Sequence, residues 1–121
     1  MERRDTLLWQ EAERLVADYL ERVGFQIVAT NLRVGRLEID IVARRRELIV
    51  VVEVRTRGET AWTRALASID WKKRERVRRA GQRLWGRRYR MDPSAERLRF
   101  DVASVTFGVA GAQIEYVPAA F

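Results

Sequence analysis

Apolar and polar positions follow a helical period near the start of the chain. Apolar residues recur at intervals of three and four from Leu8 to Val23, which predicts an amphipathic helix with one buried side. Asp5-Thr6 can cap the start of this helix, and Gly24 can end it. Glu13 lies at the border of the apolar stripe, so it is either a surface residue or one that leans into a cleft.

The next segments show the two-residue period and the β-branched composition of strands. Strands are expected at residues 25–32, 38–43, 48–54, 98–107 and 113–117. The run Leu48–Val52 is apolar throughout, as expected for a strand covered on both faces. Residues 44–47 should join the second and third strands into an antiparallel hairpin, although an Asn-Gly or Asp-Gly turn signal is absent. Residues 58–66 are predicted to form a loop that exposes Trp62.

A second helix is predicted to begin after Ser68 as N-cap and to end near Trp85, with Gly86 as its terminator. The order is then helix, three strands, helix, and one or two strands. This order predicts a single α/β domain over residues 1–121, with a mixed sheet and helices packed against it.

Two acidic residues stand inside the central hairpin. Alternation places Asp40 on one face of its strand, with Ile39 and Ile41 on the other, and places Glu53 and Arg55 together on the next strand. If the two faces coincide, Asp40, Glu53 and Arg55 converge. A carboxylate left without a partner beside the apolar run would cost several kcal/mol, so the pattern predicts a divalent cation or a nearby arginine as the partner.

Composition narrows the chemistry further. The chain has no cysteine and no histidine, which excludes cysteine nucleophiles, imidazole bases and ordinary zinc sites. A bound metal would therefore have oxygen ligands, which indicates Mg²⁺ or Mn²⁺. No apolar run of the chain approaches the roughly 20 residues that a membrane helix needs, and the N-terminus lacks the apolar core of a signal peptide. The protein is therefore expected to be cytoplasmic.

The net charge of +7 comes from one segment. Residues 72–90 contain ten basic residues and one acidic residue, whereas residues 1–71 contain twelve of each. This concentration is typical of a surface that binds a nucleic-acid backbone, and the alternative is a solvated helix face. The candidate contacts are Lys72, Arg74, Arg78, Arg79 and Arg83. Lys73 shares the helical phase of Ile69 and Val77, so it should point inward.

The spacing of the acidic residues carries a family resemblance. Asp40, twelve residues and then Glu53-Val54-Arg55 are similar to the D…(D/E)-x-K signature of the restriction-endonuclease-like (PD-(D/E)XK nuclease) superfamily. Ordered motifs over nearly the whole chain resemble the YraN-like family of uncharacterised bacterial proteins. These motifs are Glu13, Tyr19-Leu20, Gly24-Phe25, Asn31-x-Arg33, Glu38-Ile39-Asp40-Ile41-Val42, Val52-Glu53-Val54-Arg55-x-Arg57 and Arg99-Phe100-Asp101-Val102.

The resemblance implies a restriction-endonuclease-like core in the order α-β-β-β-α-β(-β). It implies that Asp40 and Glu53 bind Mg²⁺ or Mn²⁺, with Glu13 as a further acidic member of the site. It also implies nucleic acid as the partner, with DNA favoured over RNA and a homodimer allowed.

The sequence departs from the family pattern at two positions. Arg55 stands where the family has the lysine of E-x-K, and a guanidinium stays protonated at neutral pH, so Arg55 cannot act as a base. It can still bind a phosphate through its planar fork. Lys73 is the candidate to supply the amine from the second helix. The other departure is Leu37, where the family has glycine.

Three functions remain open after these observations. The first is a metal-dependent endonuclease or junction-resolving nuclease. The second is a nuclease-like protein that binds nucleic acid without cleaving it. The third is a basic partner-binding module whose acidic residues only form salt bridges with Arg55, Arg57 and Arg99.

Overall fold

The computed structural model describes residues 6–58 and 71–121. Its elements are α1 (Thr6–Arg22), β1 (Gln26–Val34), β2 (Leu37–Arg45), β3 (Leu48–Gly58), α2 (Trp71–Leu84), the π-helical turn η2 (Trp85–Tyr89), β4 (Arg97–Gly108) and β5 (Gly111–Val117). The strands form one sheet in the order β1-β2-β3-β4-β5. β3 and β4 are parallel, and the other neighbouring pairs are antiparallel. The predicted mixed sheet with two helices is therefore confirmed.

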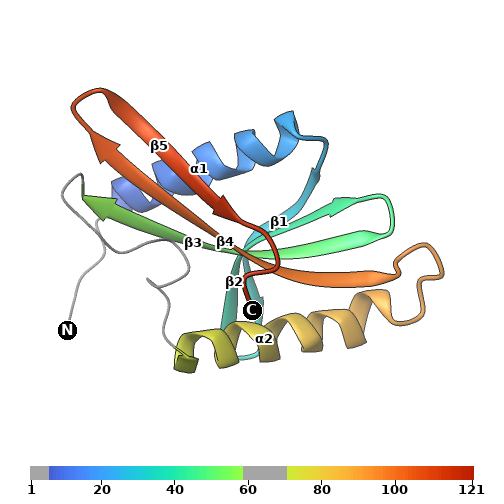
Figure 1. Ribbon diagram of the computed structural model, residues 1–121. Helices are drawn as coiled ribbons and strands as arrows, with labels where there is room; N and C mark the ends of the chain where they lie inside the picture. Colours follow the sequence, from blue (N-terminus) through green and yellow to red (C-terminus); the bar gives the residue numbers. More distant parts are fainter. Residues whose placement is uncertain (1–5, 59–70) are drawn as a thin grey trace.

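The two helices cover opposite faces of the sheet (Figure 1). α1 packs Val16 and Leu20 on a core that contains Val52. α2 packs Val77 and Leu84 on the other core, which contains the β3 side chains that point to the face opposite Val52. β3 is thus buried from both sides, as its unbroken apolar run predicts. Glu53, towards the carboxyl end of β3, points to the face that α2 covers, so side chains of α2 can reach it.

The first helix ends as predicted. Gly24 has a φ of 97°, and its N–H donates to the carbonyl of Glu21 while the N–H of Phe25 donates to that of Leu20. These two bonds form a Schellman cap, which needs a residue in the left-handed region. The predicted apolar stripe is only partly buried, since Leu8 and Val23 are each 41% exposed at the helix ends.

The α-helix α2 ends at Leu84, next to the predicted end at Trp85, but the prediction that Gly86 terminates the helical path is wrong. The chain continues through η2, where the N–H of Arg90 donates to the carbonyl of Trp85 at 2.8 Å. The wider turn brings Tyr89 into the core under α2, with its ring 5.9 Å from that of Trp85. Burial of this aromatic side chain outweighs the tendency of glycine to end a helix. The predicted cap at Ser68 and the loop with Trp62 lie outside the described residues.

The β2–β3 turn is tight despite its lack of a turn signal. Arg45 pairs with Leu48, which leaves Arg46 and Glu47 as the two turn residues. Arg46 has a φ of 58°, a conformation that glycine or asparagine adopts more readily than arginine. The carbonyl of Arg46 accepts a hydrogen bond of 2.8 Å from Nε of Arg44, and this bond helps to hold the turn.

Candidate functional site

The alternation of side chains along β2 is interrupted at Asp40. Asn31 has a φ of 50°, and the register places Thr30 opposite Ile41 and Leu32 opposite Ile39. Ile39 belongs to the core under α2, whereas Ile41 belongs to the core under α1. The predicted strict alternation, with both isoleucines on one face, is therefore wrong here. The side chain of Asp40 reaches β3, where its Oδ2 accepts a hydrogen bond of 2.9 Å from the N–H of Val54.

Asp40 and Glu53 are buried together, with exposed fractions of 4% and 1%. Burial raises the pKa of Asp40 to about 9, and the neighbouring negative charge of Glu53 adds to the rise. The hydrogen bond from Val54 and the charge of Lys73 lower the pKa of Asp40 in part. Two adjacent carboxyl groups out of water cannot both ionise easily, so at neutral pH this pair retains a proton.

Two cations approach this acidic pair. Nζ of Lys73 lies 3.4 Å from Oε2 of Glu53, and a guanidinium nitrogen of Arg55 lies 3.7 Å from the same oxygen. The predicted inward direction of Lys73 is confirmed. Lys72 is exposed, and its Nζ lies over the ring of Trp71, 6.0 Å from the centroid. The helical phase therefore separated the two lysines correctly.

The donor set of this pair fits a divalent cation. Oε2 of Glu53 is buried and accepts no hydrogen bond within the described residues, although it has the two ion pairs. Asp40 supplies a second carboxylate beside it, and hard oxygen ligands are what Mg²⁺ and Mn²⁺ prefer. Within residues 6–58 and 71–121, no group of three or more acidic side chains is arranged to hold a metal. The protein would thus supply two carboxylates, and water or substrate would complete the coordination.

Glu13 is buried on α1, where its Oε1 accepts a hydrogen bond of 3.0 Å from Nδ2 of Asn31. Asn31 lies in the irregular part of β1, next to the residues that pair on either side of Asp40. Glu13 is therefore connected to the local conformation that places Asp40, and its role as a further acidic member of the site stays a prediction.

Ser104 is a polar residue near the site that the sequence reasoning missed. It pairs in register with Arg55 on the parallel strand β4 and is 2% exposed. Its Oγ has no hydrogen-bond partner within the described residues. The signal that could have found it is alternation, since Ser104 interrupts the apolar run of β4 at the position beside Arg55.

Asp101 forms a second acidic centre, which is separate from the first. Arg99 donates to both oxygens of Asp101 at 2.9 Å, and the hydroxyl of Tyr116 and the N–H of Ala119 donate as well. Burial raises the pKa of the Tyr116 phenol, and the negative charge of Asp101 and the hydrogen bond that Tyr116 donates to it add to the rise. Arg99 therefore does not join the pair of Asp40 and Glu53, in contrast to the third functional interpretation.

The basic residues of α2 divide between two flanks. Four exposed residues spaced by three or four positions align along one stripe, which we call the basic stripe: Lys72, Arg76, Arg79 and Arg83. Arg76 was absent from the predicted contacts. Arg74 and Arg78 are half-buried on the other flank, where Arg78 bonds Glu75 at 2.9 Å and its guanidinium lies 5.9 Å from the ring of Phe121. Within the described ranges, neither helix has the length and apolarity to span a membrane.

Comparisons with known proteins agree with the motif order in the sequence. The model of the uncharacterised protein family UPF0102 matches residues 12–105. A UPF0102 protein of Sorangium cellulosum is 53% identical over 115 residues, which cover 94% of this chain and 80% of that relative. Relatives from Geobacter metallireducens and Alkaliphilus metalliredigens are 36% and 32% identical over 114 residues, which cover 94% of this chain and 91% and 96% of theirs. The chain belongs to the UPF0102 family.

Proposed function

We propose that the protein hydrolyses phosphodiester bonds of nucleic acid at the pair formed by Asp40 and Glu53, with Mg²⁺ or Mn²⁺ as cofactor. The observation that carries this proposal is the contact of two buried carboxyl groups with a lysine amine 3.4 Å from Glu53. A restriction-endonuclease-like nuclease site needs these three groups. Fold and family alone do not assign an activity, so the proposal depends on this geometry.

Each side chain of the site has a role that its chemistry permits. Asp40 and Glu53 would hold the cation, which supplies a Lewis acid and lowers the pKa of a bound water. Lys73 can exchange a proton or stabilise negative charge on the phosphate, because its amine is carried on the helix above the pair. Arg55 remains charged and can bind a phosphate oxygen through its fork. Ser104, beside Arg55, can donate a hydrogen bond to the same phosphate.

The basic stripe offers a path for the nucleic-acid backbone towards this site. Its four residues lie on the same helix as Lys73, and all four are exposed. Contacts of this kind bind phosphates without reading sequence. DNA is the favoured substrate in this proposal, as the resemblance to DNA-cleaving enzymes implies.

The experiment that tests the proposal is a metal titration with branched, duplex and single-stranded substrates. Cleavage should require Mg²⁺ or Mn²⁺, and calorimetry should detect metal binding by the parent protein. Asp40→Ala and Glu53→Ala should each lose both metal binding and cleavage. Lys72→Ala serves as the matched control for metal binding, since it changes a residue on the same helical turn that points away from the pair. Metal binding at parental affinity in both carboxylate variants would refute the assignment of the site.

The second candidate is a protein that binds nucleic acid without cleaving it. Arg55 in place of the usual lysine favours this alternative, because an arginine cannot give up a proton at neutral pH. Neutralising Arg79 and Arg83 should then weaken binding on every sequence and reduce the slope of log K against log salt by roughly 0.9 for each lost duplex contact. An unchanged slope would exclude the basic stripe as the contact surface. Absence of cleavage with every substrate and metal, together with a reduced slope, would favour this candidate over the nuclease.

A further inference from the structure

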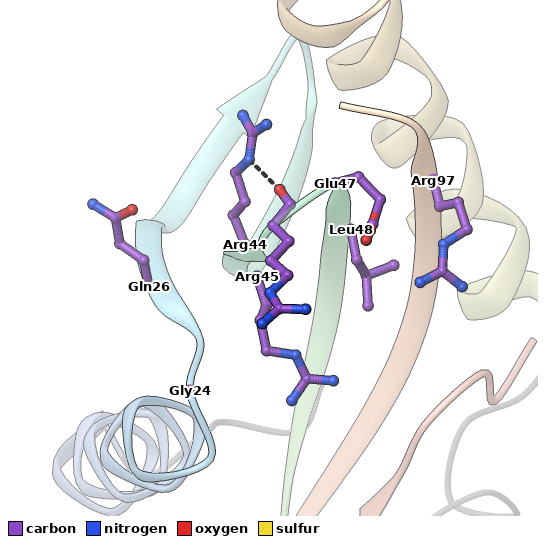
Figure 2. Close-up of a pocket in the computed structure, with 8 residues that line it drawn as sticks. Gly24, Gln26, Arg44, Arg45, Glu47, Leu48 and Arg97 are labelled. Carbon is purple, nitrogen blue, oxygen red and sulfur yellow. Dashed lines mark hydrogen bonds between the residues drawn. The ribbon is translucent and has the colours of Figure 1, made fainter. Parts of the chain in front are cut away.

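A pocket of about 740 Å³ opens at the turn between β2 and β3, and we call it the hairpin pocket (Figure 2). Its walls come from the end of α1, the start of β1, the β2–β3 turn and the start of β4. The lining residues are Gly24, Gln26, Arg44, Arg45, Arg46, Glu47, Leu48 and Arg97. Leu48 packs in the core under α1, and Arg45 lies five residues along β2 from Asp40. The pocket is therefore separate from the acidic pair and from the basic stripe.

Two of the four arginines in the hairpin pocket are committed to structural contacts. Arg44 donates to the carbonyl of Arg46, to Asp92 at 3.3 Å and to Ser94 at 2.8 Å. Arg45 donates to the carbonyl of Val23 at 3.0 Å, and its guanidinium lies 4.5 Å from the centroid of the Phe25 ring. These contacts fix the walls of the pocket, and the bond to Val23 offsets the negative end of the α1 dipole.

The other two arginines, Arg46 and Arg97, are exposed, and their side chains make no hydrogen bond or ion pair with the described part of the chain. Their backbones are nevertheless fixed. Arg97 pairs in register with Leu48, and the carbonyl of Glu47 accepts the N–H groups of Glu96 and Arg97 at 2.8 and 3.1 Å. Figure 2 shows Arg45 and Arg97 on either side of Leu48, one from each neighbouring strand. The pocket thus presents two uncommitted guanidinium groups from a rigid rim.

The charge of the hairpin pocket selects for an anion. Four arginines face one acidic residue, Glu47, so the lining has a positive excess. Guanidinium groups bind phosphate through paired hydrogen bonds. The volume lies within the range of about 300–1,000 Å³ that is usual for small-molecule sites. A concave, positively charged site of this size suits a terminal phosphate or diphosphate better than the continuous backbone of a duplex, which needs an extended surface.

We propose that the hairpin pocket binds the phosphate groups of a nucleotide-sized anion, with Arg46 and Arg97 as the direct ligands. The anion is either a free nucleotide or the phosphorylated end of a nucleic acid, since both present the same terminal phosphate. The site does not depend on the function proposed for Asp40 and Glu53, and either proposal can fail while the other holds.

Calorimetry of the full chain with inorganic pyrophosphate, in the presence of a chelator, tests this site without metal at the acidic pair. The double variant Arg46→Gln/Arg97→Gln should bind pyrophosphate at least about tenfold more weakly, because a hydrogen bond to a charged group is worth about a factor of ten or more. The control is Arg33→Gln/Arg36→Gln, which removes the same charge from exposed positions at the β1–β2 turn, far along the sheet from the β2–β3 turn. The control should bind like the parent. All of these side chains are exposed, so folding should be unaffected, and thermal melting checks this.

Glu47→Gln adds a test in the opposite direction. Removing the one acidic charge of the lining should tighten pyrophosphate binding, whereas a merely structural role of Glu47 would not. Adenosine monophosphate and an oligonucleotide with or without a 5′ phosphate then distinguish the two sources of the anion. Equal loss in the pocket variant and the control, a loss only in Arg79→Gln/Arg83→Gln, or no pyrophosphate binding by the parent would each overturn the proposal.

Discussion

The two faces of the sheet each contain a buried acidic centre, and the two centres differ in how their charge is satisfied. Asp101 receives four hydrogen bonds, two of them from Arg99. Asp40 receives one from the backbone of Val54 and lies against a second carboxyl group, Glu53. A buried carboxylate that receives all its hydrogen bonds stabilises the fold. A buried carboxyl pair in which the pKa of one member rises to about 9 lowers the stability of the folded protein.

The difference in partners between the two centres indicates which acidic residues can be assigned to function. Burial alone does not distinguish the two centres, because Asp101 is 0% exposed and Glu53 is 1% exposed. The distinction comes from the partners. Ionisable groups with strongly shifted pKa values cluster at functional sites, and a carboxyl pair with unsatisfied acceptor oxygens is a suitable ligand set for a cation. Variants should therefore affect activity at one centre and stability at the other.

The largest expected effect is on the rate of the cleavage proposed for the acidic pair. Lys73→Ala should reduce the rate by about 10²–10⁴, which is typical for the loss of a proton-transferring or charge-stabilising group, and should leave metal binding intact. Lys72→Ala, which removes a contact to the nucleic-acid backbone and no reacting group, should change the rate little at saturating substrate. Single-turnover cleavage assays measure both. A large gain in rate for Arg55→Lys, with Lys73→Ala close to the parent, would instead assign the missing amine to position 55.

The same isosteric change should have different effects at the two centres. Asp101→Asn replaces an acceptor oxygen by a donor that faces other donors, so it should reduce the free energy of unfolding by about 3–5 kcal/mol. Asp40→Asn keeps an oxygen for the N–H of Val54 and is neutral beside Glu53 without having to bind a proton, so it should be neutral or stabilising without metal. Urea unfolding at pH 7 measures both. Equal destabilisation by the two variants would remove the distinction.

Removing one donor should affect the satisfied centre only partly. Tyr116→Phe deletes the hydroxyl that donates to Asp101 but leaves the bonds from Arg99 and Ala119. A hydrogen bond to a charged group contributes about 1.5–3 kcal/mol, so the loss of unfolding free energy should fall in that range. Urea unfolding provides the measurement, and unchanged cleavage by this variant serves as its control. A loss of activity at parental stability would argue that Asp101 takes part in the reaction.

The smallest expected effect is the change in stability for each unit of pH. The folded pKa of Asp40, about 9, lies above its ordinary value of 3.8, so between these values the native state binds more protons than the unfolded state. The stability of the metal-free protein should therefore fall as pH rises through this window, by at most about 1.4 kcal/mol per pH unit from this group. Asp40→Asn should give a flatter curve. Urea unfolding between pH 5 and pH 9 measures the slope, and parallel curves for the two proteins would contradict the assigned shift.

Periodicity and residue chemistry predicted much of the fold and the centre of the site. The convergence of Asp40 and Glu53 followed from their positions on a hairpin, and the inward direction of Lys73 followed from its helical phase. The residues that escaped prediction depend on contacts between distant parts of the chain. Burial of Tyr89 continues the helical path past Gly86 as a π-helical turn, and Ile39 and Ile41 of β2 face opposite cores.

The Asp101 centre and the hairpin pocket escaped prediction for a related reason. The partners of Asp101 come from β4, β5 and the turn after β5, and their convergence depends on a register that alternation does not determine. Arg46 and Arg97 line one pocket only because β4 lies beside β3, with Arg97 in register with Leu48. The sequence shows both arginines, but nothing local indicates that they share a pocket.

The sheet order also implies an order of assembly. β2 and β3 meet across a two-residue turn, whereas Leu48 and Arg97, which start the parallel pair, are about fifty residues apart in the chain. Closing the longer loop costs about 3 kcal/mol more in chain entropy, so the local hairpin is the more accessible early structure. It brings Asp40 and Glu53 together before α2, which lies within the longer loop, can deliver Lys73. The two carboxyl groups are therefore still in water when the hairpin forms, and burial raises the pKa of Asp40 only when α2 packs on the sheet.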